Sequence, residues 1–291
     1  MIPLTPPFLE QILVNAVLLG LVYGMVGLGL SLVLGVMNVL NISHGSMYVL
    51  GGYLTYYASV QLHYTPLVSF AFAAVATFML GVFLELIFVE RVSNDAERVM
   101  LLTFGLAIII EELALLRWGG TAIPTPELVN GFIRIGHVTA RNEELLAAAV
   151  GVAIALITAA FLRYTNFGRA MRMVSQNKEA ALSVGVNPKW VFAIALGIGS
   201  LYAGLAGAFL SPIYFLYPDY QWYPLLYAFV VVVTGGLGSV AGSMIGGLIF
   251  GILETIGEVY FPSSADILVL ILIIVIILIR PRGLLGAKER V

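Results

Sequence analysis

Long apolar runs separated by short polar stretches dominate the chain. Seven runs stand out, at residues 8–34, 46–62, 66–90, 99–118, 143–162, 188–210 and 264–279. Most of them match the length of about 20 residues that a helix needs to cross the hydrocarbon core of a bilayer. Residues 224–260 are too few for two full spans and a turn, and a glycine-rich stretch at 234–243 interrupts them. The pattern therefore predicts an all-α polytopic membrane protein with about eight transmembrane helices plus broken or re-entrant segments.

Composition narrows the function classes. The 291 residues are 60% hydrophobic and 10% charged, with a mean hydropathy of +1.02. We expect one transmembrane domain over residues 1–291, without a soluble part large enough for an enzyme core. The absence of Cys excludes thiol catalysis and thiolate metal sites, and no basic face with interleaved aromatics suits nucleic acid. The N-terminus lacks the positive region of a signal peptide, so the first span should stay in the mature protein.

Residues 166–189 form the most basic polar segment between two apolar runs. Arg169, Arg172, Lys178 and Lys189 lie here, and Glu179 is the only acid. Because Lys and Arg near span ends favour the cytoplasmic side, we place this segment in the cytoplasm. A basic loop that only enforces topology would give the same composition.

The capping and helix-ending residues of this segment predict two short amphipathic helices. Asn166 can cap the first, over about residues 167–175, and Asn177 can cap the second. Gly185 can end the second helix, because Gly adopts the left-handed C′ conformation without steric cost. Asn187 and Pro188 then begin the next span as a cap and a first-turn proline.

The remaining polar stretches complete the topology. The loop 91–98 carries two Arg, and the tail 280–291 carries four basic residues against one acid, so both are placed inside. The loop 119–142 is placed outside, with a short hairpin over 131–140. An aromatic cluster over 214–223 is expected at the outer interface. Counting spans puts the N-terminus in the periplasm and the C-terminus in the cytoplasm.

The run from Glu179 to Gly185 has the pattern Glu-Ala-Ala-x-x-x-Gly. It resembles the EAA loop of permease subunits in bacterial ATP-binding-cassette importers, and residues 168–186 resemble the branched-chain amino-acid (LivH-like) permeases in particular. Ile194 to Gly197 departs from the Ile-x-Leu-Pro continuation found in many importers. The resemblance implies an ABC importer type II-like permease whose ATPase-coupling residues are Arg169, Arg172, Lys178, Glu179, Ala180, Ala181 and Gly185.

A polar cluster between the first two apolar runs is the first candidate for the translocation path. It contains Asn38, Asn41, Ser43 and His44, and the surrounding stretch resembles an Asn-x-x-His-Gly signature of LivH-like permeases. A Glu often follows that Gly in the family, whereas this chain has Ser46. Such groups must be paired or hydrated, because burying them unpaired costs about 2–7 kcal/mol. They form either a polar constriction in the path or a set of helix-to-helix hydrogen bonds and caps.

The glycine-rich break is the second candidate for the path. Gly235, Gly236, Gly238 and Ser239 resemble a Gly-Gly-x-Gly-Ser run of the same permeases. It is not a phosphate-binding loop, since the Lys-Ser/Thr pair is missing. A hinge or packing role and a gating role both fit these residues.

The resemblance implies a permease for branched-chain or other hydrophobic amino acids in the bacterial inner membrane. Its implied partners are two ATP-binding-cassette subunits (LivG/LivF-like), a second permease (LivM-like or a second copy) and a periplasmic substrate-binding protein. No cofactor is expected in this chain, because ATP and Mg²⁺ would bind the partner subunits and no Walker motif is present.

Other functions remain open from the sequence. A urea or short-amide permease of the same group is one alternative. An ion-coupled secondary transporter is another, since Glu111, Glu112, Glu254 and Glu258 fall within spans. An intramembrane protease would need a Gly-x-Ser-Gly nucleophile, which neither Ser46 nor Ser239 provides.

Overall fold

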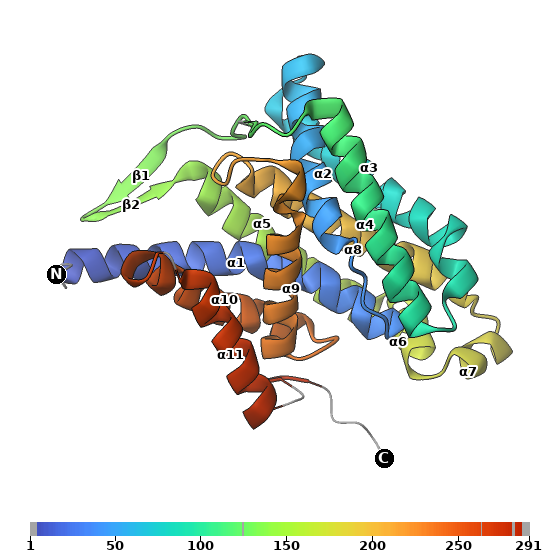
Figure 1. The fold of residues 1–291 in the computed structure, drawn as a ribbon. Helices are drawn as coiled ribbons and strands as arrows, with labels where there is room; N and C mark the ends of the chain where they lie inside the picture. Colours follow the sequence, from blue (N-terminus) through green and yellow to red (C-terminus); the bar gives the residue numbers. More distant parts are fainter. Residues whose placement is uncertain (1–4, 124, 263, 281–282, 287–291) are drawn as a thin grey trace.

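The chain folds almost entirely into helices (Figure 1). The computed structural model describes residues 5–123, 125–262, 264–280 and 283–286. The elements in chain order are α1 (Pro6–Met37), α2 (His44–Tyr56), η1 (Tyr57–Gln61), α3 (Pro66–Ile87), η2 (Val89–Val92), α4 (Ala96–Trp118), β1 (Phe132–Ile135), β2 (Val138–Arg141), α5 (Asn142–Tyr164), α6 (Asn166–Gln176), α7 (Lys178–Ser183), α8 (Pro188–Leu210), η3 (Pro218–Gln221), α9 (Trp222–Gly235), α10 (Val240–Tyr260) and α11 (Ala265–Ile279).

Six helices in the described part of the chain are long and apolar enough to cross a membrane: α1, α3, α4, α5, α8 and α10. The predicted combination of full spans and shorter membrane segments is confirmed. Two details differ. The expected span 46–62 is a 13-residue helix followed by a five-residue π-helical turn. Of the two helices expected to be shortened around the glycine-rich break, only α9 is short, with 14 residues, whereas α10 has 21.

The centre of the bundle is formed by α1 and α8, which are apolar on all sides and mostly buried. A helix that is hydrophobic all round belongs in the interior. The helices α3, α4 and α5 lie outside them and expose many apolar side chains, as expected for surfaces that face lipid. The long helix α1 packs along α10 in antiparallel fashion, with Gly20 against Gly247 and Gly35 close to Gly238.

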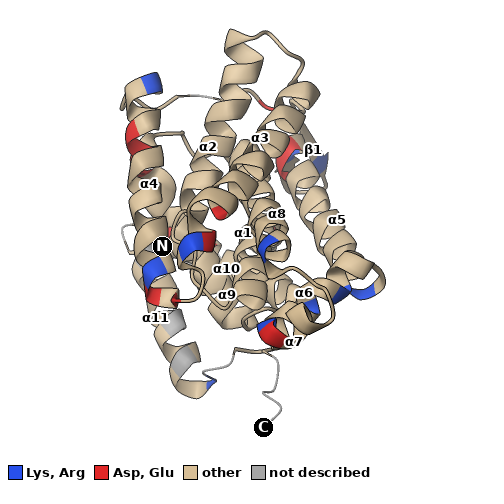
Figure 2. Ribbon diagram, turned by 90° about the vertical axis from the view of Figure 1, so that its right-hand side faces the viewer, with Lys and Arg blue, Asp and Glu red and all other residues tan. Residues whose placement is uncertain are grey.

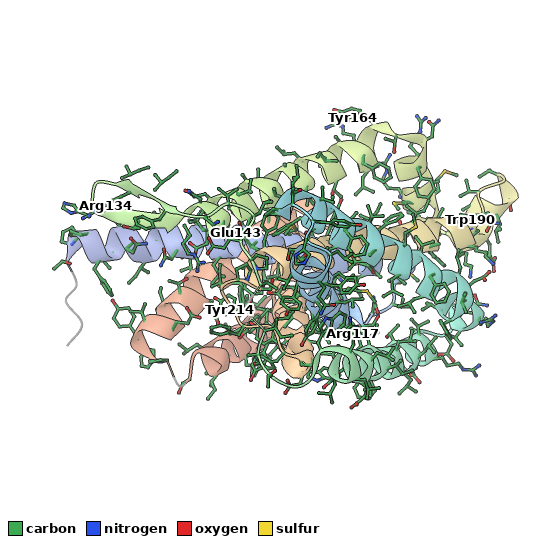
Figure 3. The ribbon with its side chains drawn as sticks, turned by 90° about the horizontal axis from the view of Figure 1, so that it is seen from above. Arg117, Arg134, Glu143, Tyr164, Trp190 and Tyr214 are labelled. Atoms are coloured by element: carbon green, nitrogen blue, oxygen red, sulfur yellow. The ribbon has the colours of Figure 1, made fainter. Side chains whose placement is uncertain are left out.

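The bundle has two distinct ends. At one end the hairpin β1–β2 lies beside the start of α1, where Gln11 and Thr139 exchange two hydrogen bonds of 2.8 Å. We call this the hairpin end. At the opposite end α6 and α7 cross the bundle, and the charged residues gather mostly toward the ends of the helices (Figure 2). Figure 3 shows this separation, with Arg134 at the hairpin end and Trp190 at the α6–α7 end.

The hairpin predicted over residues 131–140 is confirmed. Its strands pair antiparallel, with Phe132 opposite Arg141 and Ile135 opposite Val138. Gly136 occupies the turn with φ +61°, a left-handed conformation that glycine adopts without strain.

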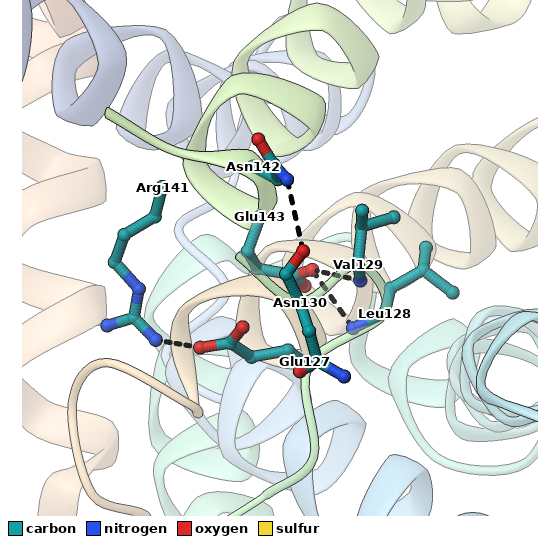
Figure 4. A network of polar contacts seen from close by, with 7 residues as sticks. All are labelled: Glu127, Leu128, Val129, Asn130, Arg141, Asn142 and Glu143. Carbon is teal, nitrogen blue, oxygen red and sulfur yellow. Dashed lines mark hydrogen bonds and ion pairs between the residues drawn. The ribbon is translucent and has the colours of Figure 1, made fainter. Parts of the chain in front are cut away.

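Behind the hairpin, a network of polar contacts fixes residues 127–130 against the start of α5 (Figure 4). One oxygen of the buried Glu143 accepts the N–H groups of Leu128 and Val129 at 2.9 and 3.0 Å. Arg141 pairs with Glu127 in the same network.

The connection between α1 and α2 doubles back into the bundle. Asn38 ends α1 in the left-handed conformation, with φ +55°. Six residues later, His44 begins α2 beside Val26, which lies near the middle of α1. The helix α2 therefore starts well inside the bundle and runs toward the hairpin end, where Tyr53 stacks on Trp118. This return explains why α2 is too short to be a full span.

Candidate functional site: the α6–α7 end and the polar return

The two short helices predicted at residues 166–189 are present, and their ends are capped by side chains. Asn177 caps α7 by accepting the N–H of Ala180 at 2.9 Å, as predicted. Gly185 has φ +84° just after α7, also as predicted. The prediction for α6 was wrong by one residue, because Thr165 is the cap. Its Oγ1 accepts the N–H of Gly168 at 2.9 Å, and Asn166 is already helical.

Both helices bury one side and expose the other. In α6, Met171 and Val174 are buried while Arg169 and Arg172 are exposed. In α7, Ala181 is buried while Glu179 and its neighbours are exposed. The exposed side chains of α7 and the following turn, which we call the α7 surface, are Glu179, Ala180, Leu182, Ser183 and Val184. Leu182 is 53% exposed and Val184 is 65% exposed. Such apolar exposure on a polar segment is typical of a surface that contacts a partner.

The segment around α7 is attached to the connection between α3 and α4. Lys178 donates to the side chain of Asn94 at 2.7 Å, and Lys189 forms an ion pair with Glu90 at 2.8 Å. These contacts join residues 84 and 99 positions apart in the sequence. A displacement of α7 would therefore act on two membrane-spanning helices as well as on α8.

The polar return contains the four residues predicted for the translocation path. Asn38 is exposed and ends α1. Asn41 is buried, and its Oδ1 accepts both the N–H of Ser43 at 3.1 Å and the Ser43 hydroxyl at 2.7 Å. His44 is fully buried, and its Nε2 donates to the Val26 carbonyl at 3.0 Å. Its Nδ1 has no hydrogen-bond partner among the described residues. These contacts form a turn at Asn41 and a hydrogen bond between α2 and α1. A role of these residues in the translocation path stays a prediction.

The glycine-rich break lies at the α6–α7 end. Gly236 and Gly238 have φ +107° and +74°, and Ser239 caps α10 by accepting the N–H of Gly242 at 3.0 Å. Thr234 and Gly235 end α9, and their carbonyls accept the N–H groups of residues 284 and 285 at 2.9 Å. A small cavity of about 90 Å³ lies between the break, α1 and α6, with Arg172 and Ser175 in its wall. The structure thus brings Gly238 close to the predicted coupling segment. The gating role of the break stays a prediction.

The sequence did not reveal a group of tyrosines and acids at the hairpin end. Tyr23 of α1 contacts Tyr227 of α9, and Glu254 and Glu258 of α10 line the same cavity. The aromatic cluster over 214–223 therefore turns partly inward. The sequence did single out residues 214–223 as an aromatic cluster, and Glu254 and Glu258 as acids one helical turn apart on α10, but it gave no sign that Tyr23 and Tyr227 join them.

A second polar connection was also not predicted. Gln221 accepts the hydroxyl of Ser46 and donates to Glu111, which links α2, η3 and α4. On α3, both carboxyl oxygens of the buried Glu85 lack a hydrogen-bond partner among the described residues.

Residues 12–279 match the family described as the permease component of the branched-chain amino acid transport system. The chain belongs to this family. It is 29% identical over 298 residues to the high-affinity branched-chain amino acid permease protein LivH of Escherichia coli K12, covering 97% of this chain and 96% of that protein. It is 26% identical to the corresponding permease protein BraD of Pseudomonas aeruginosa, with 97% of each chain covered.

Two other similarities are weaker. The permease is 24% identical to LivM of Escherichia coli K12 over 94% of its own length and 69% of LivM. Among solved structures, PsaBC from Streptococcus pneumoniae in complex with Fab covers 97% of this chain and 93% of that chain, with 15% identity and a TM-score of 0.46. Similarity at that level does not define a fold. Family and helices together establish a LivH-like, multi-pass membrane permease, and the resemblance found in the sequence is confirmed.

Proposed function

We propose that this permease forms the translocation path of an ATP-driven importer for branched-chain or other hydrophobic amino acids. It resides in the bacterial inner membrane and receives its solute from a periplasmic binding protein. The LivH and BraD relatives, whose names state branched-chain amino acid transport, support this substrate class. A LivM-like chain or a second copy of this chain completes the permease pair, and two LivG/LivF-like ATPases bind Mg²⁺-ATP. The chain itself catalyses no reaction.

The α7 surface is the observation that carries the proposal. It is a capped helix at one end of a membrane bundle, and it exposes Glu179, Ala180 and Leu182 while its segment stays attached to the α3–α4 connection and to α8. A protruding helix of this kind suits a groove in a partner, where the exposed apolar side chains would be buried. ATPase subunits that grip the α7 surface can move the membrane helices through Lys178 and Lys189.

The proposal requires α7 to face the cytoplasm and the hairpin to face the periplasm, and cysteine labelling tests this orientation. The chain contains no Cys, so a single introduced Cys is the only thiol. Ala180→Cys should react with a membrane-impermeant maleimide only in inside-out vesicles. Arg134→Cys, on the exposed hairpin, should react only from the periplasmic side of spheroplasts. The reverse labelling would exclude coupling through α7.

A matched pair of glycine variants tests coupling itself. Gly185 and Gly136 both have positive φ, and no heavy atom lies within 4 Å of a Cβ built on either. Valine adds the same backbone strain at both positions, of order 1–3 kcal/mol. In proteoliposomes with the ATPases and the binding protein, Gly185→Val should abolish ATP-driven leucine uptake while ATP hydrolysis persists. Gly136→Val should transport normally. Normal uptake by Gly185→Val would refute the coupling role.

A further inference from the structure

A cavity of about 230 Å³ at the hairpin end is lined mainly by aromatic rings and carboxylates. Six tyrosines from α1, the α8–α9 connection, η3 and α9 form its wall, and Glu254 and Glu258 project from α10. We call it the tyrosine cavity. Because its lining comes from segments between residues 23 and 262, it exists only in the folded bundle.

The tyrosines hold one another in place. The Tyr23 ring meets Tyr227 edge-on at 5.4 Å, and Tyr220 stacks on Tyr223 at 5.5 Å. Contacts of this kind fix ring orientation before any ligand arrives. The Tyr48 ring lies 6.3 Å from Tyr220, and the fully buried Tyr48 hydroxyl has no hydrogen-bond partner among the described residues. Tyr48 itself is not part of the lining, so it places an unsatisfied polar group behind the Tyr220 side of the wall.

The charge around the tyrosine cavity is negative. Tyr227 donates to Glu254 at 3.5 Å, which places that carboxylate beside the rings. Burial raises the pKa of the Tyr214 phenol, and so does the charge of Glu258 nearby. Among the described residues, no Lys or Arg lines the cavity. Aromatic faces and carboxylates together attract a cation and disfavour an anion.

A second cavity of about 200 Å³ adjoins the first and shares Tyr214 and Glu258 with it. Much of its wall is aliphatic, including Leu18, Val22 and Ile213, while Asn15, Glu144 and Thr255 add polar groups to it. A ligand that spans both cavities would therefore place a cationic group near the glutamates and an aliphatic group among these side chains.

We propose that the two cavities together bind a hydrophobic amino acid, with its α-ammonium group at Glu254, Glu258 and the tyrosine faces and its aliphatic side chain against Leu18, Val22 and Ile213. This assignment rests on the proposed function and names the site at which the permease selects its solute. The substrate carboxylate has to stay hydrated in this arrangement, because no Lys or Arg of the described residues lines either cavity.

Two leucine analogues test the site without any mutation. In 3-methylbutylamine the carboxylate is missing, and in 4-methylpentanoate the ammonium group is missing. We expect the amine to displace radiolabelled L-leucine from the complete importer in nanodiscs, without binding protein and without ATP. The acid should not displace it. Equal competition by both analogues, or competition by the acid alone, would overturn the assignment.

Carboxamide variants then locate the binding. Glu254→Gln with Glu258→Gln should weaken the binding of leucine and of the amine by about tenfold or more, since each removes a full charge while keeping shape. Glu112→Gln is the matched control, because Glu112 is exposed on α4 and lines neither cavity. Unchanged affinity in the double variant would refute the site. Tyr220→Leu should weaken amine binding through loss of the ring face.

Leucine uptake by the wild-type importer distinguishes a wrong cavity assignment from a wrong proposed function. If the wild type shows no ATP-driven leucine uptake, the proposed function is wrong. If the wild type transports leucine but the double variant binds and transports it equally well, only the cavity assignment is wrong.

Discussion

Gly247 of α10 lies so close to α1 that a methyl group does not fit between the helices. A Cβ at this position would stand 2.4 Å from the Gly20 carbonyl oxygen and 2.5 Å from the Gly24 Cα. Ordinary contact begins at 3.4 Å, so Gly247→Ala requires the helices to separate by about 1 Å (3.4 − 2.4 = 1.0). Both contact atoms belong to the backbone, and no rotamer change can relieve the clash.

The cost follows from these distances. Overpacking of this kind costs about 3 kcal/mol at its upper end, and the better helix propensity of Ala returns about 1 kcal/mol. We therefore expect Gly247→Ala to destabilise the permease by about 2 kcal/mol, or roughly 4–8 °C in thermal midpoint. Leucine uptake should fall as well, because the same seam positions Glu254 beside Tyr23.

The assay is thermal unfolding of the purified permease in mild detergent, followed by size-exclusion chromatography. Gly105→Ala is the matched control, because Gly105 lies within α4 and no heavy atom lies within 4 Å of a Cβ built there. Its midpoint should stay equal or rise slightly. If Gly247→Ala unfolds at the wild-type temperature, the close packing of α1 on α10 is not a stabilising feature and the reasoning fails.

Four further variants probe the two ends and the polar return. Thr165→Ala removes the cap of α6 and should cost about 1 kcal/mol, seen as faster hydrogen exchange confined to residues 166–176; unchanged exchange would count against the cap. Glu143→Ala removes the acceptor of two backbone N–H groups and should lower the local stability of residues 125–131 by about 1–3 kcal/mol. Trypsin should then cleave at Arg134 faster than in the wild type, and an unchanged cleavage rate would contradict this. Asn41→Ala and His44→Ala should lower leucine uptake while the variants still assemble with the ATPases; loss of membrane insertion instead would assign these two residues to structure alone.

Local features followed closely from the sequence. The run 188–210 became a helix with those same bounds, since Pro188 suits its first turn and Asn187 caps it. The hairpin and the second cap at Asn177 were predicted for the same reason: turn and cap chemistry acts over a few neighbouring residues. The error at α6 is also local. Two capping residues are adjacent, and the one with extended backbone, Thr165 at ψ 154°, takes the role.

Contacts between distant segments depended on the tertiary structure. Hydrophobic periodicity is nearly absent in helices that are apolar on all sides, so it does not say which helix packs on which. Three features join residues that are distant in the sequence. His44 bonds to Val26, Lys178 bonds to Asn94, and Tyr23 and Glu254 line one cavity. The sequence by itself determined that this chain is a helical membrane permease with a capped basic segment. Only the folded bundle decided which side chains share a cavity, because that depends on close approach at glycines far apart along the chain.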